Sequence, residues 1–397
     1  EGVRVKALVV DRSVPRLGAA RLIAPLSAAG AARVGPLQHA AVDEPVRPGP
    51  AWQRVHTRLA GICGSDLALV EGHASPYFDD WVSFPFVPGH EVVGRLDDGT
   101  RVVLEPVLGH EARGAVPPSP EAAPADGDDY AHLVTGPLEP GIQTGFCCST
   151  GGGWSPWFWA HRTQLHPVPD DVPDERAVLI EPFAGGLHAA LMAADRTRGV
   201  ERPVLAVLGA GTMGLAAIAG LRRALPDARI AVGARYPHQR RIARHYGADE
   251  VVEPDRLDRA VRRMVGCHLV GDQLSSGTHA TVDAVGSSSS IADCLRITRP
   301  RGRIVLLGMP ADVTVDLTGL WHRETELRGA YTHGTEHLPD GAVTTTFRLA
   351  FDLVDAVRAE ELLSATYTLA EHVEAIAHAA DAGPRGAVKI AFDLTRS

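Results

Sequence analysis

The stretch that decides the fold is VLAVLGAGTMGLAAIAGL, residues 204–221. An apolar run typical of a buried strand leads into Gly209-x-Gly211-x-x-Gly214, and a helix-forming segment follows. Gly209 permits a tight turn, Gly211 lets the backbone approach a pyrophosphate, and Gly214 lets the helix pack close to the sheet. The helix N-terminus then offers free N–H groups to the phosphates. The sequence therefore predicts a dinucleotide-binding turn; a purely structural glycine-rich turn is the weaker interpretation.

Strand-like and helix-like segments alternate around this turn, from about Glu181 to about Tyr331. Alternation of this kind predicts βαβ units on a parallel sheet. The first third of the chain reads instead as short β elements with many turns, and the stretch after His333 as two helices and a closing strand. We predict an α/β protein with a β-rich domain over 1–182 and 333–397 and a doubly wound dinucleotide-binding domain over 183–332. The strands expected in the second domain are 204–208, 230–232, 251–252, 280–285 and 303–307, with helices at 213–223 and 238–246.

The end of the second predicted strand bears on the choice of dinucleotide. NAD sites usually carry an acid there that binds the ribose 2′-hydroxyl. Here the residues are Gly233 and Ala234, followed by Arg235, with Arg240 and Arg241 a turn further on. A guanidinium can bind a 2′-phosphate with paired hydrogen bonds. The sequence therefore favours NADP over NAD, and a solvated arginine face on an NAD site is the alternative.

Composition excludes several classes of protein. The 397 residues are 45% hydrophobic and 22% charged, which predicts about two globular domains and excludes a disordered chain, a coiled coil or a collagen-like fibre. A net charge of −9 argues against nucleic acid or an anionic membrane as the main partner. Five cysteines are too few and too odd in number for a disulfide framework, which favours the cytoplasm, as does the lack of a signal-like apolar core in the first twelve residues. The uncharged run 204–221 nearly reaches membrane-spanning length, but its glycines fit the dinucleotide turn better.

Three segments carry candidate metal ligands: GICGSD at 61–66, PGHE at 88–91 and LIEP at 179–182. Cysteine, histidine and glutamate all bind zinc, and a catalytic zinc needs about three of them and an open position. Taken alone, each of these three segments more often has a structural role than a metal-binding one. The argument for a metal site is that all three occur in this order ahead of a dinucleotide turn.

With these motifs the sequence resembles the zinc-dependent medium-chain alcohol and polyol dehydrogenases, with a pattern similar to the sorbitol, glucose and threonine dehydrogenase branches. The resemblance implies a GroES-like catalytic domain made from both ends of the chain and a Rossmann domain between them. The matching stretches span nearly the whole chain and are GICGSD, PGHEVVG, LIEPFAGGLHAAL, VLGAGTMG, VDAVG, LLGMP and GAVKIAF.

The resemblance also implies roles for individual residues. Cys63 and His90 would bind the catalytic zinc, with Glu91 and Glu181 as further or exchanging ligands, and Ser65 would relay the substrate proton. Asp66 matches a structural acid and Lys389 its basic partner near the cofactor, and Gly308 and Met309 match the loop that touches the nicotinamide. The cofactor-binding residues expected are Gly209, Gly211, Thr212, Met213, Gly214, Gly233, Ala234, Arg235, Arg240, Gly308, Met309 and Lys389.

Two further departures from the family pattern have consequences. No cysteine lies between Cys63 and Cys147, so the four-cysteine structural zinc of many relatives cannot form and one catalytic zinc is expected. Ala68 stands where relatives often carry the histidine that ends the proton relay, which leaves the exit of the proton open. Within 105–134 the polar residues are interpreted as a solvated loop, although they include candidate ligands: His110, Glu111, Asp126, Asp128 and His132.

These observations together predict an enzyme that transfers a hydride between NADP(H) and a secondary alcohol, polyol or sugar-like hydroxyl, or the matching ketone. Its partners would be small-molecule substrates, and the family implies a homodimer or homotetramer. The alternatives are a zinc-free NADPH-dependent enone or quinone reductase of the same fold and a non-catalytic dinucleotide-binding protein. Retention of Cys63, His90, Glu91 and Glu181 argues against the former, and Ser65 beside them argues against the latter.

Overall fold

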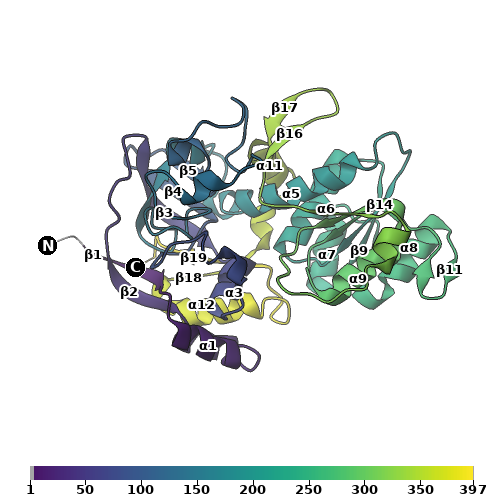
Figure 1. The fold of residues 1–397 in the computed structure, drawn as a ribbon, viewed down its shortest axis with the longest axis horizontal. Coiled ribbons are helices and arrows are strands. Elements are labelled where there is room, and N and C mark those ends of the chain that lie inside the picture. The colour runs from purple at the N-terminus through teal and green to yellow at the C-terminus, as the bar shows by residue number, and fades with distance from the viewer. Residues whose placement is uncertain (1–3, 397) are drawn as a thin grey trace. The chain divides into compact units, whose positions relative to one another are not determined.

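The computed structural model describes residues 4–396, which form two compact units (Figure 1). The first unit runs to Glu181 and resumes at Arg358, and the second is Pro182–Val357. The first division lies next to the predicted one, but the second falls at 357/358 and not at 332/333. Residues 333–357 belong to the second unit because Glu336 pairs with His188 at 2.6 Å, and because Phe347 is fully buried there.

The second unit is built on a six-stranded, wholly parallel sheet in the order β10-β9-β8-β13-β14-β15. Because the chain runs outward from β8 in one direction and then in the other, this is the doubly wound order. All five residues of β8 are buried, as expected of a central strand covered on both faces. The Rossmann-type prediction is confirmed. The strands are β8 (Val204–Leu208), β9 (Arg229–Gly233), β10 (Glu250–Val252), β13 (Thr278–Asp283), β14 (Thr298–Leu306) and β15 (Glu326–Gly329).

Helices connect these strands, and smaller elements complete the unit. Helix α5 begins just before the division of the chain and continues into the second unit. The helices are α5 (Ile180–Asp195), α6 (Thr212–Ala224), α7 (Pro237–His245), α8 (Leu257–Val265), α9 (Ser288–Ile297), α10 (Thr318–His322) and α11 (Thr346–Ala356). Two short antiparallel ribbons are β11 (Leu269–Val270) with β12 (Gln273–Leu274), and β16 (Thr335–His337) with β17 (Val343–Thr345).

The first unit contains a seven-stranded sheet in the order β18-β19-β3-β4-β5-β7, with β6 also paired to β3. Every pair is antiparallel except β18 with β19. Because β19 pairs with β3, both parts of this unit meet in one sheet, with Ala391 opposite Gly61. The strands are β3 (Trp52–Gly61), β4 (Val92–Leu96), β5 (Arg101–Leu104), β6 (Trp157–His161), β7 (Leu165–Pro167), β18 (Leu363–Tyr367) and β19 (Lys389–Asp393), with helices α3 (Gly64–Val70), α4 (Asp174–Ala177) and α12 (His372–Ala380).

The segment between the first two strands corrects the prediction of short β elements throughout the first third. Strands β1 (Arg4–Val10) and β2 (Leu37–Asp43) pair as predicted strands would, but α1 (Val14–Ile23) and α2 (Ala28–Val34) connect them. Alanine, leucine and arginine, all strong helix formers, dominate this connection. Pro15 stands in the first turn of α1, and the Ser27 hydroxyl accepts a hydrogen bond from Gly30 N at 3.0 Å.

The lobe between residues 105 and 147 is held by one buried side chain, Arg113, which is 2% exposed. Its guanidinium donates hydrogen bonds to four main-chain carbonyls, those of Thr135, Leu138, Glu139 and Gly141, at 2.7–3.4 Å. The lobe is therefore a built structure and not the solvated loop that its composition suggested.

The polar residues of this lobe do not converge on a common point. The rings of His110 and His132 stack with centroids 3.7 Å apart, and Asp126 caps its own turn by accepting from Ala123 N. Within residues 4–396, the side chains that could hold a metal ion together are Cys63, His90 and Glu91, which lie outside this lobe.

One helical stretch, Asp174–Asp195, has the length and apolar character of a membrane span. Of its apolar 18-residue window, 78% is buried inside the protein. The other apolar run, 204–221, is divided between β8 and α6 by the turn at Gly209. Both runs are core elements of the fold.

Candidate functional site

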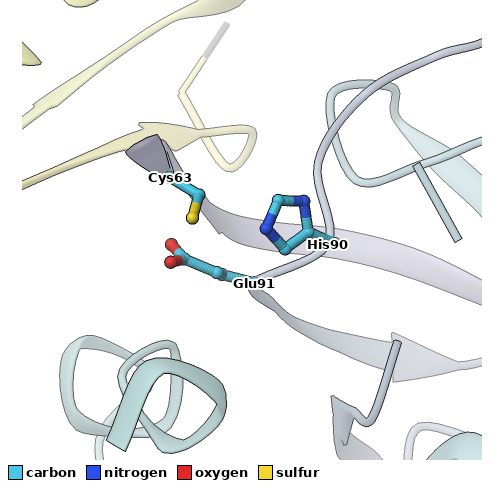
Figure 2. Close-up of side chains that lie close together, drawn as sticks. All are labelled: Cys63, His90 and Glu91. Atoms are coloured by element: carbon cyan, nitrogen blue, oxygen red, sulfur yellow. The ribbon is translucent and has the colours of Figure 1, made fainter. Parts of the chain in front are cut away.

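Three side chains in the first unit point toward one common space: Cys63, His90 and Glu91 (Figure 2). One ligand atom from each, the thiol sulfur, a ring nitrogen and a carboxylate oxygen, lies within 4.8 Å of the other two. His90 and Glu91 are buried, and Cys63 is half-buried. No other group of this kind occurs within residues 4–396.

Cys63 owes its position to the junction between β3 and α3. The strand ends at Gly61, and Cys63 is the extended residue that caps the following helix, with φ −90° and ψ 160°. Asp66, one turn into α3, accepts a hydrogen bond from Cys63 N at 2.9 Å through Oδ2. Its other oxygen, Oδ1, lies 3.7 Å from His90 Nδ1. The buried Asp66 carboxylate therefore faces both Cys63 and His90, and it orients these two candidate metal ligands.

His90 and Glu91 are positioned by the tight turn at Gly89, whose φ is +99°. A Cβ atom at this position would come within 2.7 Å of Trp154 N, so only glycine fits. Gly153 N donates to Gly89 O at 2.8 Å and Trp154 N donates to Pro88 O at 2.9 Å, which fix the turn against the core. The aromatic ring of Phe146 packs beside His90 with centroids 5.8 Å apart.

The charges around His90 and Asp66 are strongly coupled. Burial alone would lower the pKa of His90, but the carboxylate of Asp66, then Cys63 and Glu181, outweigh it and raise that pKa from 6.5 to about 10. Burial is the largest cause at Asp66 and raises the pKa of its carboxyl above 3.8. The pocket therefore gathers negative charge that a cation would compensate.

Lys389 lies in β19 and is buried, with 3% of the residue exposed. Its Nζ forms an ion pair with Glu91 Oε2 and donates to Ile62 O at 3.0 Å. Burial acts to lower the pKa of Lys389, but Glu91 and then Cys63 raise it above 10.5 overall. The direct partner of Lys389 is thus Glu91 and not Asp66, which corrects the pairing that the family resemblance implied.

The ion pair needs the space left by a missing side chain at Gly61. A Cβ atom there would overlap Glu91 Oε2 and come within 2.9 Å of Lys389 Cε. Sequence reasoning did not single out Gly61 as a functional residue. The signal was its place at the end of a strand, two residues before the candidate ligand Cys63.

Two further residues were expected at the catalytic site: Glu181 as a metal ligand and Ser65 as the proton relay. Glu181 is in the first turn of α5 and is half-buried; its oxygens fall outside the 4.8 Å group, although its charge acts on both His90 and Lys389. Ser65 is half-buried in the first turn of α3, two residues after Cys63. Ala68 follows one turn further along the same helix.

The predicted dinucleotide turn has the expected geometry in the second unit. Gly209 follows β8 with φ +89°, and Gly211 caps α6. A Cβ atom at Gly214 would overlap the carbonyl oxygen of Gly209, whereas one at Gly211 would meet no atom within 4 Å. Gly214 is thus needed for helix packing, and the space beside Gly211 at the start of α6 suits a phosphate.

The residues expected at the ribose lie at the end of β9. Arg235 is exposed and lines a surface hollow of about 310 Å³ together with Glu253, Pro254 and Asp255. Arg240 uses its guanidinium to donate to the carbonyls of Ala234 and Arg235, at 3.1 and 2.7 Å. Arg240 therefore shapes the turn, and Arg235 is the guanidinium that faces the hollow.

The loop expected at the nicotinamide is built around a close approach of two backbones. A Cβ atom at Gly308 would overlap Gly286 N, and Gly308 N donates to Asp283 O at 2.8 Å. Asp283, at the end of β13, also accepts from Val285 N and Gly286 N through its side chain. Met309 is 69% exposed beside this junction. Asp283 is a further organising residue that sequence reasoning missed.

The donors in the first unit fit zinc. A thiol, an imidazole and a carboxylate are the three ligand chemistries that zinc takes from proteins, and they converge from two segments, 61–66 and 88–91. Asp66 facing His90 is the carboxylate–histidine arrangement that orients a metal-binding imidazole.

Comparisons with known proteins agree with this geometry. The family model described as "Alcohol dehydrogenase GroES-like domain" matches residues 49–170, and "Zinc-binding dehydrogenase" matches residues 212–347. The chain belongs to the zinc-dependent medium-chain alcohol and polyol dehydrogenases. It is accordingly an oxidoreductase that acts on CH–OH groups of small alcohols or polyols, with zinc and a nicotinamide dinucleotide as cofactors.

Its relatives include sorbitol dehydrogenase from Homo sapiens, which is 28% identical over 72% of this chain and 75% of its own length. Erythritol/L-threitol dehydrogenase from Mycolicibacterium smegmatis is also 28% identical, over 68% of this chain and 72% of its own. Among solved structures, a putative zinc-binding dehydrogenase from Sinorhizobium meliloti bound to NADP has a TM-score of 0.67 at 20% identity, covering 98% of this chain and 99% of its own. The similarity to this solved structure shows that the two chains share a fold.

Proposed function

We propose that this dehydrogenase oxidises a secondary hydroxyl of a polyol or sugar-like substrate, or reduces the matching ketone, with one zinc per chain and NADP(H) as the hydride carrier. The observation that carries the proposal is the convergence of Cys63, His90 and Glu91 within 4.8 Å. Glu181, whose charge acts on the same pocket, is the further carboxylate ligand. The polyol class is supported by the relatives, which are named for sorbitol and for erythritol or L-threitol.

The protein's own groups account for the movement of the proton and the hydride. The zinc supplies Lewis acidity toward the substrate oxygen, which lowers the pKa of the hydroxyl. The Ser65 hydroxyl would accept the proton from that oxygen and pass on its own. The nicotinamide, when bound, would supply the hydride acceptor, so that oxidation of the alcohol to the ketone would be balanced by reduction of NADP⁺ to NADPH and release of one proton. Asp66 holds Cys63 and His90 in position throughout.

The preference for NADP rests on Arg235. The end of β9 carries no acid to bind a ribose 2′-hydroxyl, and the exposed guanidinium of Arg235 lines the adjacent hollow. Glu253 and Asp255 line the same hollow and oppose a phosphate there, so Arg235 has to outweigh them. The substitution Arg235→Ala should weaken NADPH binding far more than NADH binding. Equal losses for the two cofactors would refute the assignment.

Location and assembly complete the proposal. All five cysteines are free thiols, which fits a reducing compartment such as the cytoplasm. We expect a homodimer or a homotetramer, and light scattering coupled to size-exclusion chromatography distinguishes these from each other and from a monomer.

The decisive experiment measures metal per chain by elemental mass spectrometry on gently purified protein, followed by turnover of a panel of polyols and ketones. About one zinc together with NADP-linked oxidation of polyols supports the proposal. About two zinc ions would contradict the single site. Protein that holds no zinc, takes none up when zinc is added and reduces enones instead would overturn the zinc mechanism.

A further inference from the structure

Helix α1 presents an apolar stripe to solvent and not to the protein core. Val14, Gly18 and Leu22 stand four residues apart, so these positions lie on one face of the helix. Val14 and Leu22 are 76% and 79% exposed, and a Cβ atom at Gly18 would meet no atom within 4 Å. Leu26, which is 87% exposed, continues the spacing of four in the turn after the helix. These four residues are called the α1 stripe below.

The buried side of α1 faces away from the stripe. Of the ten residues of this helix, all within the described part of the chain, only Ala20 is buried. Ala20 stands two residues from both Gly18 and Leu22, which places it across the helix from them. A Cβ atom at Gly35, just after α2, would come within 3.4 Å of Ala20 Cβ, and α2 in turn packs against α12. Figure 1 shows α1 at the outer edge of the first unit, so the packing of this unit does not use the α1 stripe.

The segment that carries the stripe has a local charge opposite to that of the whole chain. Residues 12–42 contain no aspartate or glutamate, although the chain has a net charge of −9. Their arginines are all exposed and are Arg12, Arg16, Arg21 and Arg33. Arg12 pairs with Asp79 at 3.2 Å, and no acid within the segment neutralises the other three. An exposed apolar stripe in a cationic segment is complementary to an anionic surface with an apolar layer beneath it.

Charge and shape separate the possible occupants of the stripe. A second copy of the chain would bring the same arginines against one another, and a ten-residue helix, about 15 Å long, is short for the roughly 1,000 Å² that a stable interface buries. A phospholipid bilayer requires no complementary shape. An apolar helix face enters the boundary between headgroups and acyl chains, while arginines contact the headgroup phosphates. The stripe therefore suits a bilayer with anionic headgroups better than a second copy.

We propose that helix α1 attaches this dehydrogenase to anionic phospholipid bilayers, with the α1 stripe among the headgroups and the arginines of 12–42 on the phosphates. The net charge of the chain argues against such a surface, but charges act on a membrane within about a Debye length, so the local charge of the contacting segment governs this contact. The attachment is independent of the proposed function, because neither the metal cluster nor the dinucleotide turn includes a residue of 12–42.

The test sediments the full chain with vesicles made of equal parts phosphatidylglycerol and phosphatidylcholine, and with vesicles of phosphatidylcholine alone. The wild type should bind the anionic vesicles, and bind them less as the ionic strength rises. The double variant Leu22→Ser/Leu26→Ser should bind them about tenfold more weakly, because it removes most of the apolar area of the stripe. The matched control is Val116→Ser, which removes an 86% exposed apolar side chain from the lobe and should bind as the wild type does.

Two further changes separate the apolar contribution from the ionic one. Gly18→Leu adds an apolar side chain in open space at the centre of the stripe and should strengthen binding, whereas Gly18→Ala improves the helix without much apolar area and should have little effect. Arg16→Gln with Arg21→Gln should weaken binding to the anionic vesicles by about tenfold and leave binding to phosphatidylcholine unchanged. Circular dichroism checks that each variant is folded.

The outcomes are distinct. A wild-type protein that stays in the supernatant with anionic vesicles at low ionic strength overturns the inference, as does a Leu22→Ser/Leu26→Ser variant that binds as tightly as the wild type. A double variant whose oligomer, measured by light scattering, is smaller than that of the wild type would show that a second copy covers the stripe, and the membrane assignment would then be wrong. None of these measurements uses zinc or turnover, so a failure of the proposed function would leave them unchanged.

Discussion

Two regions of the first unit are built around buried ionic groups, and they solve opposite problems. In the Cys63, His90 and Glu91 cluster, three side chains of the kinds that bind metals converge on a point, and the ammonium of Lys389 pairs with one of them. In the lobe, the buried Arg113 cation already has four carbonyl partners. The first region is assembled to receive a cation, and the second has a cation of its own built into the chain.

The difference supports the proposal of a single zinc per chain. Many relatives are expected to hold the corresponding lobe with a structural zinc on four cysteines, which this sequence lacks. A guanidinium carries five donors in a rigid plane, so it can bind several carbonyls at once and fix a loop without a metal. Metal dependence in this protein should therefore belong to catalysis and not to the folding of the lobe.

The largest expected effect comes from removing a ligand. Cys63→Ala should lose bound zinc and reduce kcat/KM by about a thousandfold, because Lewis-acid stabilisation worth several kcal/mol disappears. Metal analysis and steady-state kinetics on the same preparation check both losses. The matched control is Cys148→Ala, a half-buried thiol outside the cluster, which should keep metal and activity. Zinc-free Cys63→Ala protein with full activity would be incompatible with the site.

The next effect concerns the lobe. Arg113→Met should lower the free energy of unfolding by about 3 kcal/mol, because four main-chain carbonyls, two of them in buried hydrogen bonds, lose a charged donor. Urea denaturation measures the change, and zinc content of the folded protein should stay at the wild-type value. Arg113→Lys should recover only part of the loss, since an ammonium cannot span four carbonyls. An Arg113→Met protein as stable as the wild type would show that the lobe is held by something else.

A smaller effect is expected at the residue that orients the ligands. Asp66→Asn keeps the shape of the side chain but removes the negative charge facing His90, so zinc affinity should fall by about 10- to 100-fold. Competition with a chelator of known affinity gives the number. An affinity equal to that of the wild type would mean that Asp66 serves only to cap helix α3.

The smallest and most local effect should follow removal of the metal from the wild-type protein. Amide hydrogen exchange should speed up around residues 61–66 and 88–91, and exchange within 131–141, where Arg113 binds, should not change. Loss of protection in the lobe on treatment with a chelator would contradict the contrast between the two regions.

Sequence alone predicted the parts of the fold that carry strong local patterns. The glycine turn, the parallel sheet and the three motifs of the metal site were all visible because each needs particular residues at fixed spacing. The helices between β1 and β2 were missed, since alanine-rich segments show little hydrophobic periodicity even though their propensity is helical. The second boundary was placed too early because the hairpin and helix of 333–357 give no sign in sequence of the unit they pack against.

The candidate site shows the same limit. Cys63 and His90 could be named from their motifs, but the partnership of Lys389 with Glu91 depends on the pairing of β19 with β3, which no local pattern encodes. Arg113 was invisible for a similar reason: one arginine among many gives no signal until the carbonyls around it are placed.

The pairing of β19 with β3 also sets a schedule for biosynthesis. Lys389 and the Ile62 carbonyl that anchors it are 327 residues apart in sequence. A nascent chain therefore carries Cys63, His90 and Glu91 through most of its translation with Glu91 lacking its ammonium partner. The metal-binding pocket reaches its final charge balance only when the strand around residue 389 has left the ribosome and joined the sheet.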